Sequence, residues 1–282
     1  MLQKQSPSLI LAQKQKKLLY EGAPVCQDFG NKHFYYSSSV MNCVYDCEYC
    51  YLQGMYPSAN QVIFVNLEDI FKEVELLLKK HPVYLCVSYD TDLLAMENIL
   101  GYVKEWSEFA LKHSGLTIEI RTKSANHSPL NRLVPNENII FAWTLSPQGI
   151  AERFEHNTPS LNQRLSCIQE AIQKGFPVRL CFDPMLYIED WRNLYSDMIE
   201  TTFSAISGDK IKDASIGAFR VSHDYMKQMR KQRPDSQIIQ YPFENENGVF
   251  QYGKKLSKEM IVFAYEKISR FIPEDKIFLW EA

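Results

Sequence analysis

Three cysteines lie within eight residues of one another: Cys43, Cys47 and Cys50, with the spacing C-x3-C-x2-C. The chain has 7 cysteines, an odd number, and its first 20 residues are rich in Gln and Lys without the apolar stretch that directs export. We therefore expect a reducing compartment, where clustered cysteines indicate metal or redox chemistry rather than disulfides.

Thiolate sulfur is the ligand that iron–sulfur clusters require. Three thiolates from one tight loop can hold three irons of a 4Fe–4S cluster and leave the fourth iron open, as catalytic metal sites generally do. The alternative is a structural zinc site. Zinc needs four ligands, commonly from paired C-x2-C units, and the sequence has no second pair, although Cys26 and His33 can complete such a site.

The elements that must position these cysteines alternate between strands and helices after residue 30. Apolar and aromatic runs predict strands over 33–38, 83–88, 116–121, 139–145, 178–182 and 215–221. Helical spacing predicts helices over 10–20, 67–80 (capped by Asn66), 93–113, 126–133, 161–175, 191–206 and 257–271. Six units are too few for an eightfold barrel. We expect an α/β fold, a partial (βα)6 TIM-like barrel, with a doubly wound sheet as the alternative.

The chain divides into three expected parts: an N-terminal lead-in (1–30), the partial barrel (31–222) and a C-terminal extension packing on the barrel (223–282). The net charge of −3 excludes a protein held to nucleic acid by bulk positive charge, so any such contact must be local. The best basic cluster is Lys227, Arg230, Lys231 and Arg233. No apolar run approaches the ~20 residues of a membrane span, and we expect a cytoplasmic protein with no membrane partner.

The cysteine segment resembles the signature of radical S-adenosylmethionine enzymes, C-x3-C-x-aromatic-C after the first strand of a partial barrel, with Tyr49 as the aromatic residue. The resemblance implies the radical S-adenosylmethionine type of barrel and a 4Fe–4S cluster on Cys43, Cys47 and Cys50. It also implies S-adenosylmethionine on the unique iron, which one electron would cleave to give a 5′-deoxyadenosyl radical. The protein would orient cofactor and substrate and exclude water.

A narrower resemblance covers most of the chain. Its segments look like the spore photoproduct lyase family in similar order and spacing: Cys47-Glu-Tyr-Cys-Tyr-Leu-Gln53, Thr91-Asp92, Arg121-Thr-Lys123, Trp143-Thr-Leu-Ser-Pro147, Phe154-Glu155, Arg164-Leu165, Gly175-Phe-Pro-Val178 and Ile216-Gly-Ala-Phe-Arg220. That family repairs a thymine dimer, 5-thyminyl-5,6-dihydrothymine, in spore DNA. The resemblance implies a DNA-repair lyase, with DNA as partner and an electron donor such as flavodoxin or ferredoxin.

Matched positions imply which residues meet S-adenosylmethionine: Tyr49, Thr91, Asp92, Lys123, Thr144 and Ser146. The residue types alone also allow purely structural roles for these positions. Lys123 can be an exposed lysine at a strand end, Thr91 and Asp92 can cap the helix that follows, and Thr144 can be the polar end of an apolar strand. Tyr49, and Tyr51 on the other side of the last cysteine, can be packing aromatics.

Hydrogen return is where this chain departs from its relatives. Characterised lyases use a cysteine after the second barrel strand for this step, and family spacing puts Tyr89 at that position. Cys86 lies three residues earlier and can be a small buried hydrophobe. We expect Cys86 or Tyr89 to act as the donor, with Tyr51 as a further catalytic residue.

Three functions are therefore compared. The first is a spore photoproduct lyase. The second is a radical enzyme of the same family with another substrate, such as a modified nucleic acid, a peptide or a metabolite. The third is a non-catalytic metal-binding protein.

Overall fold

The main sheet of the computed structural model, which describes residues 7–23 and 26–280, has the strand order β16-β12-β11-β9-β8-β7-β3-β2. Six consecutive strands are parallel, namely β3 (Phe34–Ser37), β7 (Val83–Cys86), β8 (Leu116–Thr122), β9 (Ile139–Thr144), β11 (Val178–Met185) and β12 (Asp213–Ala218). They are neighbours in chain order, whereas a doubly wound sheet reverses its order at a switch point. This order confirms the partial (βα)6 barrel.

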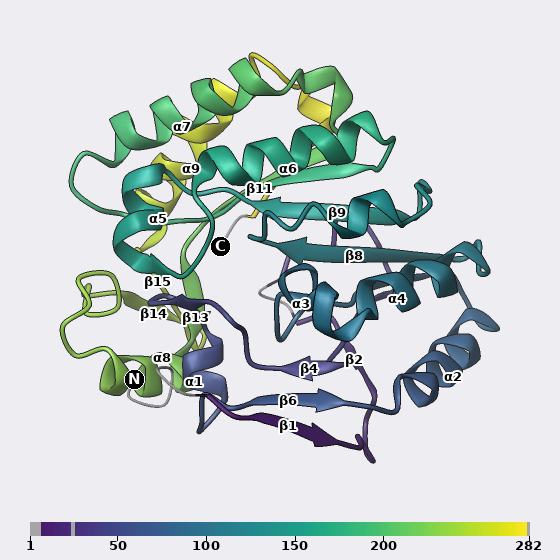
Figure 1. Ribbon diagram of the computed structural model, residues 1–282. Coiled ribbons are helices and arrows are strands. Elements are labelled where there is room, and N and C mark those ends of the chain that lie inside the picture. The colour runs from purple at the N-terminus through teal and green to yellow at the C-terminus, as the bar shows by residue number, and fades with distance from the viewer. Residues whose placement is uncertain (1–6, 24–25, 281–282) are drawn as a thin grey trace.

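Helices cover the outer face of this sheet (Figure 1). The longer ones are α2 (Leu67–Leu78), α3 (Leu93–Leu100), α4 (Tyr102–Leu111), α6 (Leu161–Gln173), α7 (Trp191–Ala205) and α9 (Lys254–Ile268). Each buries one apolar stripe; α2, for example, buries Leu67, Ile70 and Val74 against the strands. No helix of the described residues is both long and apolar enough to cross a membrane.

Several predicted elements are wrong in detail. Residues 10–20 form no helix: β1 (Leu9–Ala12) pairs with β6 (Gln61–Phe64), and β2 (Leu19–Glu21) pairs with β3. Leu9, Ile10 and Leu11 of β1 are contiguous and exposed, so they offer no helical stripe to bury.

The expected helix over 93–113 is two helices, because Gly101 takes a left-handed conformation with φ 69° that ends α3. The expected helix over 126–133 is a single 3-10 turn, Pro129–Asn131. Local side-chain bonds compete with a helix there, since Ser128 N donates to Asn126 Oδ1 at 3.2 Å. Asn66 precedes α2 but makes no capping bond, because its Oδ1 accepts from Lys14 N at 2.9 Å.

The segment that begins at Cys26 crosses the inside of the barrel. Gln27 Nε2 donates to the carbonyl of Leu279 at 3.0 Å. The Phe29 ring lies 6.2 Å from that of Tyr84 on β7 and 5.3 Å from that of Phe278 on β16 (Ile277–Leu279). Because β7 and β16 lie toward opposite ends of the sheet, this segment fills the barrel interior and carries Cys26 into it.

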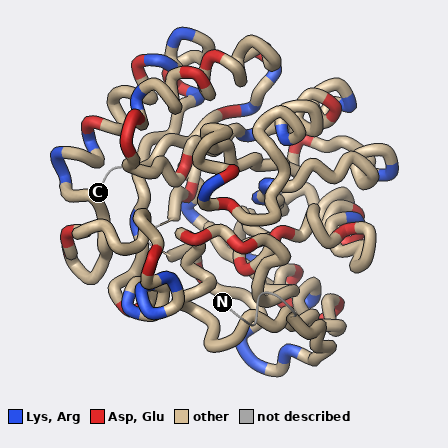
Figure 2. Tube along the Cα trace, turned by 60° about the vertical axis from the view of Figure 1, so that its left-hand side comes forward, with Lys and Arg blue, Asp and Glu red and all other residues tan. Residues whose placement is uncertain are grey.

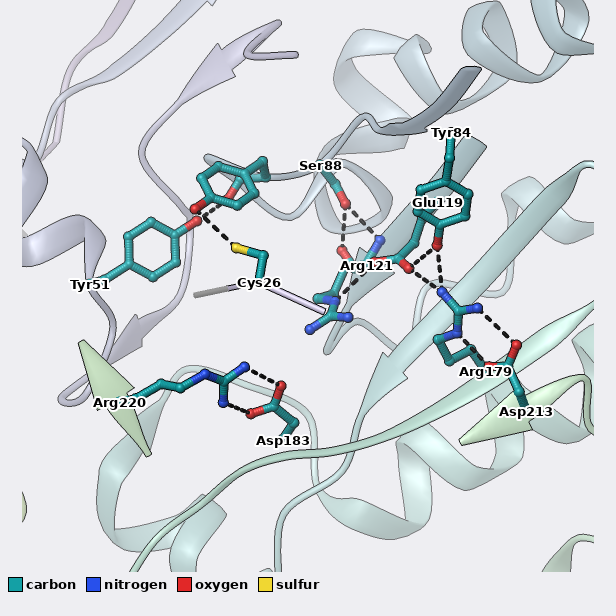
Figure 3. Close-up of polar contacts among 11 residues, drawn as sticks. Cys26, Tyr51, Tyr84, Ser88, Glu119, Arg121, Arg179, Asp183, Asp213 and Arg220 are labelled. Atoms are coloured by element: carbon teal, nitrogen blue, oxygen red, sulfur yellow. Dashed lines mark hydrogen bonds and ion pairs between the residues drawn. The ribbon is translucent and has the colours of Figure 1, made fainter. Parts of the chain in front are cut away.

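Charged side chains fill one layer of the barrel. Arg179 on β11 donates to Asp213 Oδ2 at 2.8 Å and to Glu119 Oε2 at 2.5 Å, and Tyr84 donates to the same Glu119 oxygen at 2.5 Å (Figure 3). Arg179 and both carboxylate side chains are almost fully buried. Each buried charge therefore has an opposite charge and hydrogen bonds beside it, as burial requires.

Candidate active site

The cysteine loop follows β3 and is fixed by backbone pairing. A short strand, β5 (Asp46–Cys47), pairs antiparallel with β10 (Glu155–His156), so that Cys47 lies opposite Glu155. Cys50 N donates to the carbonyl of Cys47 at 3.1 Å, and the side-chain amide of Gln53 donates to the same carbonyl at 2.5 Å. The loop is thereby attached to the segment after β9, on the edge of the barrel where the strands end.

The three thiols fit an iron–sulfur cluster better than zinc. Burial raises the pKa of Cys47, Lys123 opposes that rise, and Glu155, Cys50 and Cys43 add to it. The charges of Cys43 and Cys50 thus act on Cys47, which lies in the same loop. Among the described residues, no three His, Cys, Asp or Glu side chains are grouped to hold a single metal ion. In a cluster each thiolate binds a separate iron, so such convergence is not required.

The two residues offered to complete a zinc site, His33 and Cys26, have other partners. The His33 ring stacks on His81 with centroids 3.7 Å apart, and Cys26 Sγ lies 3.5 Å from the hydroxyl of Tyr89. Neither joins the loop cysteines as a fourth ligand to one ion.

Glu155 lies at the centre of a cluster of polar side chains behind Cys47. We call this cluster, which also contains Tyr49, Lys123, Ser146 and Arg164, the polar wall. Its Oε1 accepts from Tyr49 Oη and from Ser146 Oγ, the latter at 2.6 Å, and lies 3.8 Å from Lys123 Nζ. Its Oε2 accepts from Arg164 Nη2 at 2.5 Å. Burial alone would raise the pKa of Glu155, but these cations and hydroxyls lower it to about 2. Glu155 is therefore a permanent anion.

A Glu155→Gln substitution should destabilise the fold by roughly 3 kcal/mol at pH 7, because one pKa unit corresponds to ~1.4 kcal/mol. The pKa of Glu155 is lowered from 4.5 to about 2, so its contribution is complete above pH 4.5 and is lost as the pH falls toward 2. Urea unfolding should show a difference between wild type and variant that is largest at neutral pH and shrinks below pH 4.5. A constant difference down to the lowest pH would contradict this account.

The structure brings three of the six expected cofactor residues together at Glu155: Tyr49, Lys123 and Ser146. Burial would lower the pKa of Lys123, yet Glu155 and Cys47 outweigh burial and raise it, so Lys123 is a cation beside the cysteine loop. Its Nζ also lies 5.2 Å from the centroid of the Tyr49 ring.

The other three expected residues have structural partners. Asp92 caps α3 by accepting from Ala95 N at 3.0 Å, and its other oxygen accepts from Lys123 N at 2.7 Å. Thr91 Oγ1 lies 3.8 Å from Met96 Sδ. The carbonyl of Thr144 accepts from Arg164 Nη1 at 3.1 Å. Asp92 thus holds the backbone of Lys123, and contact with a ligand stays a prediction for all six.

A thiol and two tyrosines lie beside the cysteine loop. The Tyr51 hydroxyl donates to the carbonyl of Tyr89, whose own hydroxyl lies 3.5 Å from Cys26 Sγ (Figure 3). The rings of Tyr51 and Tyr89 have centroids 5.5 Å apart. Burial raises the pKa of Cys26, so this thiol keeps its S–H hydrogen at neutral pH. Cys86 is 5% exposed on β7, and burial, followed by Glu119, likewise raises its pKa.

Sequence reasoning missed two features of the site. It did not identify Cys26 as a partner of Tyr89, and it did not identify Glu155 as the residue that binds the polar side chains behind Cys47. Cys26 gives no local signal, because it stands in an irregular segment 63 residues from Tyr89. The Phe154-Glu155 segment is part of the family resemblance, so the sequence did mark Glu155. It did not indicate which four side chains contact this carboxylate.

Comparison with known proteins supports the resemblance. A family model described as spore photoproduct lyase matches residues 35–270. The spore photoproduct lyase of Clostridium acetobutylicum is 24% identical over 221 residues, which are 76% of this chain and 64% of that protein. The spore photoproduct lyase of a Geobacillus species is 20% identical over 175 residues, 61% of this chain and 51% of that protein. This chain therefore spans half to just under two thirds of these curated relatives.

Solved structures share the fold. A spore photoproduct lyase complexed with dinucleoside spore photoproduct superposes with a TM-score of 0.84 at 16% identity, covering 97% of this chain and 82% of that chain. A double mutant of a spore photoproduct lyase, with bound AdoMet and the same dinucleoside, gives a TM-score of 0.82 at 17% identity, with the same coverage.

Proposed function

The chain belongs to the spore photoproduct lyase family, and we propose that it is a radical S-adenosylmethionine lyase that splits 5-thyminyl-5,6-dihydrothymine in DNA. The observation that carries this proposal is the placement of a protonated thiol, Cys26, and of Tyr51 and Tyr89 beside the cysteine loop. A lesion-splitting radical reaction needs both a site that generates a radical and a hydrogen donor that ends it. A binding protein needs neither.

The residues of the loop and its polar wall fit the two cofactors. Cys43, Cys47 and Cys50 would hold the cluster, and Lys123 offers a cation to the carboxylate of S-adenosylmethionine. When bound, this pair supplies the 5′-deoxyadenosyl radical that abstracts hydrogen from the substrate. Glu155 keeps Lys123 charged and fixes the loop through β10, so the protein's part is to hold both cofactors in one geometry.

Hydrogen return falls to Cys26. Its S–H bond breaks, the hydrogen atom passes to the carbon radical of the split lesion, and a thiyl radical remains on Cys26. The Tyr89 hydroxyl, 3.5 Å away, can restore the thiol by giving up its own hydrogen atom, which leaves a tyrosyl radical on Tyr89 in place of the thiyl radical. Cys26 thus takes the role that a cysteine after the second strand has in characterised lyases, approaching from the N-terminal segment instead.

A Lys123→Ala substitution should weaken S-adenosylmethionine binding to the reconstituted protein by on the order of 10–100-fold, the loss expected for one charge-assisted hydrogen bond. Equilibrium dialysis measures the affinity, and iron content shows whether the cluster is intact. Lys112→Ala, at an exposed lysine that ends α4, is the matched control. An unchanged affinity with full iron would remove Lys123 from the cofactor site.

The basic run on α8 (His223–Gln232) is only half available for DNA. Figure 2 shows basic and acidic residues interspersed over the fold. Arg230 donates to the carbonyls of Ile239 and Tyr241, and Arg233 pairs with Asp46 at 2.5 Å. Lys227 and Lys231 are the remaining cations of the run, and both are exposed.

Replacing Lys227 and Lys231 together by alanine should weaken duplex DNA binding and reduce the slope of log affinity against log salt by up to ~1.8, because each phosphate contact contributes ~0.9. Fluorescence anisotropy at several salt concentrations measures both quantities. Replacing the exposed pair Lys79 and Lys80 at the end of α2 should leave the slope unchanged. If both double variants behave as wild type, α8 is only a solvated helix.

The proposed function is tested with anaerobically reconstituted protein, dithionite, S-adenosylmethionine and dinucleoside spore photoproduct. Thymidine should appear, and no product should form from an undamaged thymidine dinucleoside. Cleavage of S-adenosylmethionine with an untouched lesion would point instead to another substrate. A protein that binds no iron–sulfur cluster would not be an enzyme of this kind.

A further inference from the structure

Arg121 is a cation inside the barrel that the proposed mechanism does not use. Arg121 stands on β8 between Glu119 and Lys123, so the strand's alternation turns all three side chains to the same inner face. Its backbone is fixed, because its N–H donates to Ser88 Oγ at 2.6 Å and its carbonyl accepts from that hydroxyl at 2.9 Å. The adjacent residues, Ile120 and Thr122, are buried on the opposite face.

The terminal nitrogens of Arg121 make no hydrogen bond to the residues that the structure describes. Its Nε donates to Glu119 Oε1 at 3.1 Å, and this is its one side-chain hydrogen bond to the part of the chain that the structure describes. Its side chain is 32% exposed although it lies in the middle of the barrel, so solvent reaches it through the interior. The guanidinium of a charged arginine carries further N–H donors that can bind a ligand there.

The Arg121 side chain lies near Cys26. In Figure 3 the guanidinium points between Cys26 and the Arg220–Asp183 pair, in which Arg220 donates to Asp183 at 2.8 Å. Consistently, the charges of Arg121, Arg220 and Asp183 all act on the Cys26 thiol. A ligand bound by Arg121 would therefore lie against the hydrogen donor.

The charged side chains around Arg121 favour an uncharged ligand. The cations Arg121 and Arg179 are matched by Glu119 and Asp213, and Arg220 is matched by Asp183. A phosphate would meet no excess positive charge here. A carbonyl oxygen needs only a donor, and a charged donor makes the stronger bond. Lys123 is the next inward-facing residue after Arg121 and lies nearer the open edge of the barrel. Arg121 is therefore deeper in the barrel and further from the backbone of a DNA strand bound outside it.

We propose that Arg121 anchors the substrate, its terminal nitrogens donating hydrogen bonds to carbonyl oxygens of a pyrimidine base of the lesion and holding that base against Cys26. This inference rests on the proposed function. It assigns base recognition to a residue within the barrel, and leaves the phosphodiester to groups outside it.

Two ligands test the proposal: dinucleoside spore photoproduct, which has no phosphate, and the phosphodiester-linked dinucleotide. Equilibrium dialysis against reconstituted protein with S-adenosylmethionine should show that Arg121→Gln weakens both by the same factor, about 10- to 100-fold. Arg121→Lys keeps a charge beside Glu119 but lacks the planar fork, and should also weaken both equally. Arg270→Ala, at an exposed arginine, is the control.

A loss confined to the dinucleotide would assign Arg121 to phosphate and overturn the proposal, as would unchanged binding of both ligands. Thermal unfolding identifies a variant that has lost its fold, in which case the lysine variant decides. If wild-type protein binds neither ligand, the proposed function itself fails. If wild type binds and the variants bind equally well, only the role of Arg121 fails.

Discussion

Replacing Cys43, Cys47 or Cys50 by alanine should abolish iron binding and S-adenosylmethionine cleavage together. Each thiolate holds one iron of the cluster, and no other described cysteine is placed to replace it. Iron and sulfide analysis measures the cluster, and the yield of 5′-deoxyadenosine measures cleavage. This is the largest effect expected, a fall of both quantities to background.

Cys167→Ala is the matched control. Cys167 is a fully buried cysteine on α6, so its loss leaves a small cavity and removes no ligand. It should keep full iron and full cleavage. If a variant of the cysteine loop also keeps both, the ligand assignment is wrong and a different set of residues holds the metal.

Replacing Cys26 by alanine should separate cofactor cleavage from repair. The radical would still form, because the cysteine loop and its polar wall are untouched, but the radical of the split lesion would have no thiol to quench it. We expect S-adenosylmethionine cleavage to continue while most of the thymidine yield is lost to other products. Chromatography of the reaction with dinucleoside spore photoproduct gives both quantities.

Cys86→Ala is the comparison that decides between the two thiols. It should keep its thymidine yield, because the Tyr89 hydroxyl contacts Cys26 and Cys86 is a buried residue within β7. The reverse pattern, with repair lost in the Cys86 variant and kept in the Cys26 variant, would identify Cys86 on β7 as the hydrogen donor.

The sequence predicted the parts of this molecule that depend on local pattern. Strands such as Ile139–Thr144 carry contiguous apolar residues, and the spacing of Cys43, Cys47 and Cys50 by itself indicates an iron–sulfur site. The expected helix 93–113 failed only where Gly101 adopts a left-handed conformation, which apolar periodicity does not detect.

The parts that depend on long-range contact could not be predicted. Glu155 meets the loop of Cys47 only because β10 pairs with β5, and the two residues are 108 positions apart in the chain. Cys26 reaches Tyr89 because Phe29 and Gln27 fix its segment inside the barrel. In both cases the functional role comes from tertiary packing and leaves no periodicity or motif in the neighbouring sequence.

The most direct test of the account is repair of dinucleoside spore photoproduct in deuterium oxide. A thiol exchanges its hydrogen with solvent, so Cys26 would donate deuterium to the carbon radical, and mass spectrometry of the thymidine should find one deuterium on its methyl group. The Cys26→Ala variant should lose that labelled product. Thymidine released without solvent deuterium, or labelled equally by the variant, would contradict hydrogen return from Cys26.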